Sequence, residues 1–195
     1  AGGLHAILFL KECSRIFDSL VIGEGEECIV QAITDVMASN LKNIYKQEHP
    51  IDINLYPYPL RKYLPASAVA RKGLIALKSK KGYDELLSTT VIFSRGCCLY
   101  RCAFCHIPQQ NKYSPGIRYR TPKLIESEIE YLKRDYNIEG ISLIDDISIP
   151  LNPKEAILYL ETIGRTGIIW KGQCRAGGII PETAKLARAS GCMAM

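Results

Sequence analysis

The sequence has no run of about 18 apolar residues, so it predicts no membrane-spanning helix. No positively charged segment followed by an apolar one marks the N-terminus as a secretory leader. The chain also lacks a strong charge of either sign: the formal net charge is +5 and most positive residues are scattered. A balance this mild does not predict a nucleic-acid partner. We therefore expect a cytoplasmic globular chain without membrane or nucleic-acid partners.

The two ends of the chain also lack features of a complete protein. The first residue is Ala1 rather than methionine, and residues 191–195 have the composition of an apolar strand with nothing after it. We expect the chain to be a piece of a longer protein, in which some catalytic residues lie outside the piece.

Cysteine, by contrast, is abundant, with eight residues, four of which fall within the nine positions from Cys97 to Cys105. Disulfide scaffolds of small secreted proteins space their cysteines along the whole chain. A cluster this tight is more typical of a metal or iron-sulfur site in a reducing compartment.

Apolar periodicity predicts an α/β chain in three parts. Residues 1–40 contain a strand, a glycine-rich turn and a helix with apolar residues at spacings of three and four. Residues 41–87 lack strong periodicity and contain four prolines from Pro50 to Pro65, which predicts an interdomain linker. From residue 88 to 195, short β-branched or apolar runs alternate with amphipathic helices that begin near prolines, a pattern that predicts a parallel sheet.

Three chemically active segments follow three successive strands of this predicted sheet. The cysteine-rich loop follows the first strand, Asp145 and Asp146 follow the second, and Arg175 follows the third. The carboxyl ends of parallel strands lie at one edge of a sheet, where active sites of α/β proteins form. We therefore expect these segments to converge.

Within the loop, Cys98, Cys102 and Cys105 have the spacing C-x3-C-x2-C. A [4Fe-4S] cluster has four irons, so three thiolates leave one iron open for a further ligand such as the amino and carboxylate groups of S-adenosylmethionine (SAM). Structural zinc would need a second pair of ligands, and no such pair lies nearby. An electron-transfer cluster would need a fourth cysteine, for which Cys174 is the candidate. Cys97 is an alternative first ligand.

The loop resembles the cysteine motif of the radical SAM superfamily. In that superfamily an aromatic residue at the position of Phe104 packs near the adenine of SAM. Further segments, at residues 2–6, 21–26, 117–122, 128–132 and 144–146, resemble the cobalamin (B12)-dependent class of this superfamily. The likeness covers nearly the whole chain. It implies the end of a Rossmann-like cobalamin-binding domain, followed by the first half of a partial (β/α) TIM-like barrel.

The resemblance also implies roles for individual residues. The glycines would lie near the cobalamin tail, the acidic pair would hold the SAM ammonium, and the arginine would pair with the SAM carboxylate. The family's Asp-x-His-x-x-Gly segment is either upstream of this piece or absent, so no residue of the piece is assigned as the lower axial cobalt ligand, and no catalytic residue is named. The expected cofactor contacts are Phe104, Asp145, Asp146, Arg175, Gly2, Gly3, Gly23 and Gly25, and the expected metal ligands are Cys98, Cys102 and Cys105.

The function that this resemblance implies is reductive cleavage of SAM to a 5′-deoxyadenosyl radical, with methyl transfer to an unactivated carbon. An electron donor such as flavodoxin or ferredoxin and a small-molecule substrate would be the partners. Two alternatives stay open: a methylthiotransferase acting on tRNA or protein, and a non-catalytic iron-sulfur or zinc module. The second cluster of a methylthiotransferase would need more cysteines than Cys13 and Cys28 provide.

Overall fold

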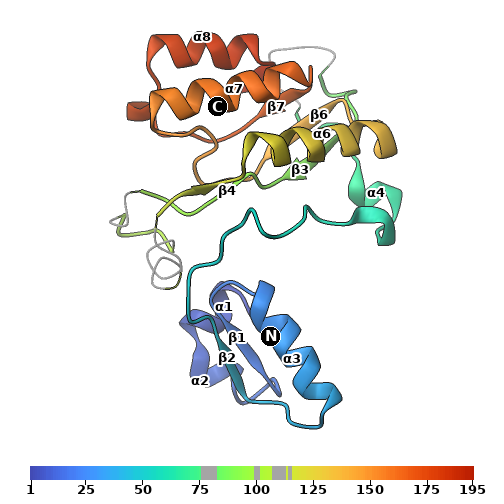
Figure 1. Ribbon diagram of the computed structural model, residues 1–195, viewed down its shortest axis with the longest axis vertical. Coiled ribbons are helices and arrows are strands. Elements are labelled where there is room, and N and C mark those ends of the chain that lie inside the picture. The colour runs from blue at the N-terminus through green and yellow to red at the C-terminus, as the bar shows by residue number, and fades with distance from the viewer. Residues whose placement is uncertain (76–82, 99–101, 107–112, 114–115) are drawn as a thin grey trace. The chain divides into compact units, whose positions relative to one another are not determined.

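The computed structural model describes residues 1–75, 83–98, 102–106, 113 and 116–195 (Figure 1). The chain forms two compact units. The first comprises Ala1–Asp52 and Gly96–Ile117, and the second comprises Ile53–Arg95 and Arg118–Met195. Among the described residues, no helix combines the length and the apolar character that crossing a membrane requires.

The first unit contains a short parallel sheet with helices. Strands β1 and β2 pair in parallel, with Val21 opposite Tyr45. Ala1 lies beside β1, because its amino group donates to the Ser19 carbonyl (2.6 Å) and its own carbonyl accepts from the Val21 amide (2.7 Å). The elements are α1 (Leu4–Leu8), α2 (Leu10–Cys13), β1 (Leu20–Ile22), α3 (Glu26–Met37) and β2 (Ile44–Lys46).

Helix α3 confirms the predicted strand–turn–helix unit, but only part of its apolar face is buried. Cys28 and Ala32 pack with Tyr45 and the edge of Val21. Four other apolar positions of the pattern are exposed, since the two-stranded sheet is too narrow to cover them. They are Ile29, Ile33, Val36 and Met37.

The interval 41–87 differs from the predicted linker. Strand β2 lies inside it and belongs to the sheet of the first unit. Residues from Ile53 onward belong to the second unit, where they form a 3-10 turn at Arg61–Tyr63 and the short helix α4 (Ala66–Val69). The elements here are only three or four residues long, but the side chains in and between them are packed: Ile53, Val69 and Ile75 are buried.

The second unit is a four-stranded parallel sheet in the order β3-β6-β7-β8, as the alternating pattern predicted. Figure 1 shows three helices side by side against this sheet. Its core joins apolar residues of the strands and helices around the fully buried Trp170. The elements are β3 (Ser88–Val91), α6 (Pro122–Tyr136), β6 (Gly140–Leu143), α7 (Pro153–Arg165), β7 (Ile169–Lys171), α8 (Pro181–Ala189) and β8 (Cys192–Ala194).

Local signals explain where these helices begin. Pro122, Pro153 and Pro181 each occupy the first helical turn, where the missing N–H is not needed. The Asn152 side chain caps α7 by accepting from the amides of Lys154 (3.0 Å) and Glu155 (3.4 Å).

Candidate functional site

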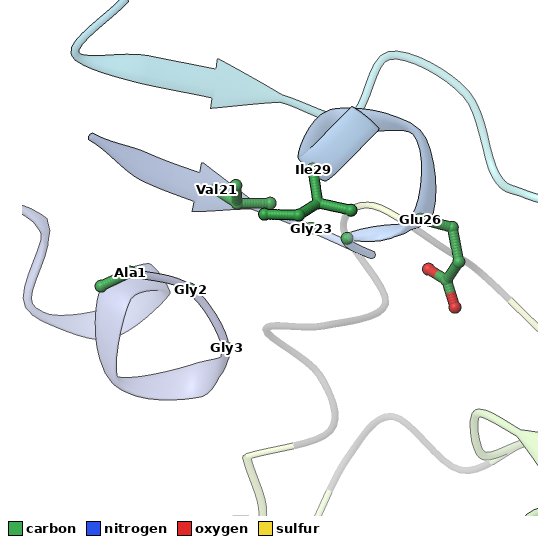
Figure 2. Close-up of a pocket in the computed structure, with 8 residues that line it drawn as sticks. Ala1, Gly2, Gly3, Val21, Gly23, Glu26 and Ile29 are labelled. Atoms are coloured by element: carbon green, nitrogen blue, oxygen red, sulfur yellow. The ribbon is translucent and has the colours of Figure 1, made fainter. Parts of the chain in front are cut away.

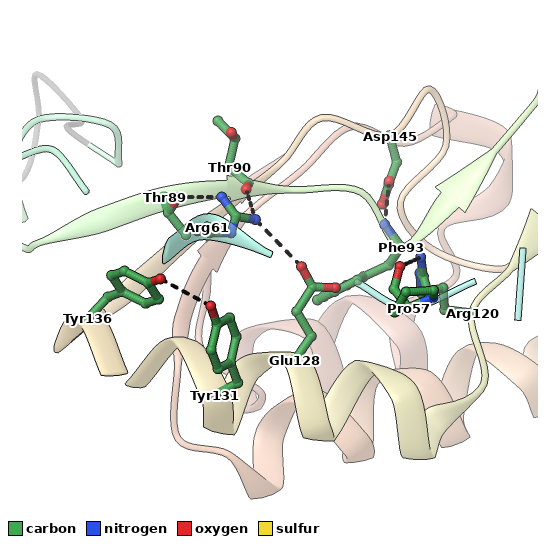
Figure 3. Close-up of polar contacts among 10 residues, drawn as sticks. All are labelled: Pro57, Arg61, Thr89, Thr90, Phe93, Arg120, Glu128, Tyr131, Tyr136 and Asp145. Carbon is green, nitrogen blue, oxygen red and sulfur yellow. Dashed lines mark hydrogen bonds and ion pairs between the residues drawn. The ribbon is translucent and has the colours of Figure 1, made fainter. Parts of the chain in front are cut away.

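The carboxyl ends of β3 and β6 are joined by one carboxylate. Oδ1 of Asp145 accepts a hydrogen bond from the backbone amide of Phe93 at 2.8 Å (Figure 3). The same oxygen accepts a second hydrogen bond from the amide of Ser94 at 3.0 Å. The Ser94 hydroxyl donates to the Ile147 carbonyl at 2.9 Å. The residues that follow β3 are thereby fixed to the residues that follow β6.

The segment after β7 joins the same edge. The Ser148 amide donates to the Gln173 carbonyl (2.7 Å), and the Gln173 amide donates to the Ser148 hydroxyl (3.0 Å). The predicted convergence of three strand ends is therefore confirmed within the second unit. Arg175 follows at the start of a 3-10 turn (Ala176–Gly178) and is exposed.

The two aspartates after β6 lie in different environments. Asp145 is 1% exposed, whereas Asp146 is exposed. Successive side chains of an extended segment point to opposite faces of the sheet. Asp145 therefore lies on the same helix-covered face as Leu143, whereas Asp146 lies on the same open face as Ile144. Of the predicted acidic pair, Asp146 alone is accessible to a ligand.

Burial raises the pKa of Asp145 to about 7, against the opposing effect of the two backbone hydrogen bonds that its carboxylate accepts. The charges of Asp146 and Glu128 raise this pKa further. Its second oxygen, Oδ2, is buried with no hydrogen-bond partner among the described residues, as is the hydroxyl of Tyr159 from α7. Asp145 therefore sits in a confined polar site between the sheet and its helices.

A buried ion pair lies between the start of the second unit and α6. Arg61 donates to the Thr89 hydroxyl (3.1 Å) and the Thr90 carbonyl (3.0 Å), and its Nη2 lies 3.5 Å from Oε1 of Glu128 (Figure 3). Burial raises the pKa of Glu128, and the charges of Arg61 and Arg120 oppose that shift. Sequence reasoning missed this pair, because nothing local marks an arginine 67 positions away from its glutamate as buried.

The cysteine loop leaves the second unit and returns to it through a short antiparallel pair, β4 (Ser94–Arg95) and β5 (Arg118–Tyr119). Just beyond this pair, Gly96 has a φ of +94°, and a Cβ there would clash with the carbonyl oxygen of Gly116. Only glycine fits that position without displacing the returning strand.

The four clustered cysteines are half-buried, and the described residues form no disulfide with them. A turn closes the C-x2-C part of the motif, with the Cys105 amide donating to the Cys102 carbonyl at 3.0 Å. Phe104 projects from this turn and is 95% exposed. The part of the loop that the structure describes holds no preassembled group of three metal-ligating side chains. Residues 99–101 and 107–112 lie outside the described residues.

The four glycines of the predicted cobalamin contact line one pocket of the first unit, about 600 Å³ in volume. Figure 2 shows this pocket, which Val21, Glu26 and Ile29 also line. Gly23 needs its glycine identity, since its φ is +102° and a Cβ would lie 2.5 Å from Oε1 of Gln47. The pocket opens at the carboxyl edge of this sheet, beside the end of β1 and beside Ala1.

Gln47, another residue that the sequence did not reveal, connects the pocket with the cysteine loop. It is 6% exposed, and its Oε1 accepts from the Glu24 amide at 2.6 Å. Its Nε2 donates to the carbonyls of His49 (2.8 Å) and Tyr113 (3.4 Å). The Tyr113 ring packs against the first unit's core, with the Lys46 ammonium 5.9 Å from its centre. Gln47 therefore forms hydrogen bonds both with the turn beside the glycine pocket and with Tyr113 in the returning part of the cysteine loop.

Comparison with known proteins identifies the fold. No protein-family model and no curated protein matches the chain. Two solved structures are similar, each with a TM-score of 0.62. One is the radical S-adenosylmethionine methyltransferase TsrM from Kitasatospora setae, with cobalamin and a [4Fe-4S] cluster bound; it is 16% identical, and the match covers 98% of this chain and 40% of that one.

The other is OxsB, a cobalamin-dependent S-adenosylmethionine radical enzyme with aqua-cobalamin bound, which is 17% identical over 97% of this chain and 28% of that one. The chain thus has the fold of a segment of these enzymes and spans less than half of their length. The expected α/β class is confirmed. The predicted contacts to SAM, cobalamin and iron stay predictions.

Proposed function

We propose that the chain is the cofactor-binding part of a cobalamin-dependent radical SAM enzyme. The observation that carries this proposal is the C-x3-C-x2-C motif in a loop that follows the first strand of a parallel sheet, within a chain whose fold matches TsrM over 98% of its length. In this proposal residues 88–195, with the cysteine loop, correspond to the first strands of a radical SAM barrel. Residues 1–40 correspond to the end of a Rossmann-like domain.

The donor set suits the cluster. Cys98, Cys102 and Cys105 are half-buried, close in sequence and not in disulfides among the described residues, and a turn brings the last two close along the backbone. Three thiolates match an iron-sulfur cluster with one open iron better than a closed structural zinc site. When bound and reduced, the cluster supplies the electron that splits SAM into methionine and a 5′-deoxyadenosyl radical.

The glycine pocket suits a flat group such as the cobalamin tail. Its backbone is bare of side chains at Gly2, Gly3, Gly23 and Gly25, so a planar ligand can approach the main chain closely. Val21 and Ile29 add apolar surface. This lining supports cobalamin as the occupant. Methyl transfer is proposed as the reaction because the similar structure TsrM is a methyltransferase.

For SAM itself, we propose Asp146 as the ligand of the ammonium and Arg175 as the ligand of the carboxylate, since both are exposed beyond strand ends that converge. Phe104, which projects freely, would pack against the adenine. A small-molecule substrate and a flavodoxin- or ferredoxin-like electron donor complete the proposed reaction.

Because the piece alone is expected to be inactive, the test is anaerobic reconstitution of the full-length protein with iron and sulfide, followed by SAM and dithionite. We expect about four irons per chain, as in a single cubane, and 5′-deoxyadenosine as a product. A Cys102→Ala variant should lose both. Cys98→Ala should behave in the same way, whereas Cys97→Ala should keep its iron. Zinc without iron, or deoxyadenosine formation unchanged in Cys102→Ala, would contradict the proposal.

A further inference from the structure

Asp145 holds the protein backbone through one of its two carboxylate oxygens. Its Oδ1 accepts two amides, from Phe93 at 2.8 Å and Ser94 at 3.0 Å, and the side chain is 1% exposed. Both amides belong to the segment that leads from β3 into the cysteine loop. Without the carboxylate, two buried N–H groups would lose their acceptor, which is unfavourable in a site closed to water.

The returning stem of the loop is fixed to the same short segment after β6. The Tyr119 hydroxyl lies 3.2 Å from the carbonyl oxygens of both Ile147 and Ile149. Ile147 thus accepts from both stems, since the Ser94 hydroxyl also donates to its carbonyl at 2.9 Å. The amide of Arg120 closes the arrangement by donating to the Phe93 carbonyl at 2.7 Å.

We propose that Asp145 is a positioning residue for the metal centre: it clamps the outgoing stem of the cysteine loop so that the thiolates are held for cluster binding. Ser94 precedes Cys98 by only four positions, so the backbone that Asp145 fixes sets the direction in which the loop departs. This inference rests on the proposed function, because it assumes that the thiolates bind a cluster. It gives Asp145 a different task from the SAM contact that the acidic pair predicted.

The environment of Asp145 favours the clamp over a SAM contact. Asp145 shares its buried site with Glu128 from α6 and Tyr159 from α7, on the helix-covered face of the sheet. A ligand reaching the carboxyl edge from the open face would meet Asp146 and Ile144, which are exposed. The two neighbouring aspartates therefore have different roles: Asp145 clamps the loop stem, and Asp146 is the proposed contact to SAM.

The experiment compares four reconstituted proteins: wild type, Asp145→Ala, Asp145→Asn and a control, Ser88→Ala. Asparagine keeps an oxygen that can accept both amides, whereas alanine does not. Ser88→Ala removes a buried hydroxyl at the opposite end of β3. The measurements are the rate of iron transfer to a ferrous chelator, the EPR spectrum of the reduced cluster, SAM affinity, and unfolding monitored by Trp170 fluorescence.

We expect Asp145→Ala to release iron roughly tenfold faster, the order of effect seen when groups that orient metal ligands are removed. Asp145→Asn and Ser88→Ala should stay near wild type in this rate and in the EPR line shape. If Asp145→Ala does not fold, Tyr119→Phe decides: it should also speed iron release, by a smaller factor.

Two results would overturn the inference while leaving the proposed function intact. One is wild-type iron retention in Asp145→Ala. The other is iron retention in both Asp145 variants together with loss of SAM affinity, which would make Asp145 a SAM ligand. Failure of the wild-type protein to take up iron would instead refute the proposed function itself.

Discussion

Replacing Asp145 with asparagine is expected to remove a pH dependence from the stability of the second unit. In the folded protein, burial raises the pKa of this carboxyl group from 3.8 to about 7. The folded chain therefore binds a proton more tightly than the unfolded chain, and the associated stability is present at low pH. It is lost as the pH rises between about 4 and 7, the interval that separates the two pKa values.

The size of the effect follows from the shift. Three pKa units at 1.36 kcal/mol each correspond to about 4 kcal/mol of unfolding free energy. The groups that face Asp145 are Asp146, Glu128 and Tyr159, and both carboxylates raise its pKa. The raised pKa of Glu128 adds a further loss with rising pH, but it is present in both proteins and cancels in their difference.

The assay is urea unfolding monitored by the fluorescence of Trp170, the single tryptophan, which is 0% exposed in the core of the second unit. Wild type should lose about 4 kcal/mol more than Asp145→Asn between about pH 4 and pH 8. Parallel pH profiles for the two proteins would refute the assignment of a raised pKa to this buried carboxyl group.

Two further substitutions test the packing on which the candidate sites depend. Gly23→Ala should destabilise the first unit by about 1–3 kcal/mol and weaken cobalamin binding, because of its positive φ and the approach of Gln47, as followed by circular dichroism and cobalamin absorbance. For the stability measurement Gly25→Ala is the matched control, since a Cβ there meets nothing within 4 Å, and equal destabilisation by the two would contradict the reasoning. Arg61→Met should lower the stability of the second unit by about 3–5 kcal/mol by stranding the Glu128 carboxylate. Adding Glu128→Leu should recover much of this loss in the Trp170 assay, and a purely additive double variant would show that the pair is not coupled.

The sequence was sufficient to predict the elements of the second unit, because their signals are local. Prolines and Asn152 mark helix starts, and apolar spacing marks the faces of α6 and α7. Strand β2 was missed because three residues with a single buried side chain, Tyr45, give no periodicity to detect. The sequence also did not predict the burial of residues between 53 and 75, because their elements are too short to show an apolar periodicity.

The candidate site was predictable in its chemistry but not in its geometry. The sequence identifies the acidic pair after β6, yet only the position of the strand end decides that Asp145 turns toward the helices and Asp146 away from them. Gln47 and Arg61 escaped sequence reasoning because their partners, Tyr113 and Glu128, are 66 and 67 positions away. Such contacts depend on tertiary packing and leave no mark in the local pattern.

The proposed function requires that three thiolates leave one iron of a cubane open to SAM. The most direct measurement is the EPR spectrum of the reduced, reconstituted protein before and after SAM is added. A change in the g-values on SAM addition, absent when Cys102 is replaced with alanine, is the predicted result. A cluster whose spectrum ignores SAM because a fourth side chain completes its coordination, or a protein that takes up no iron, would contradict the account.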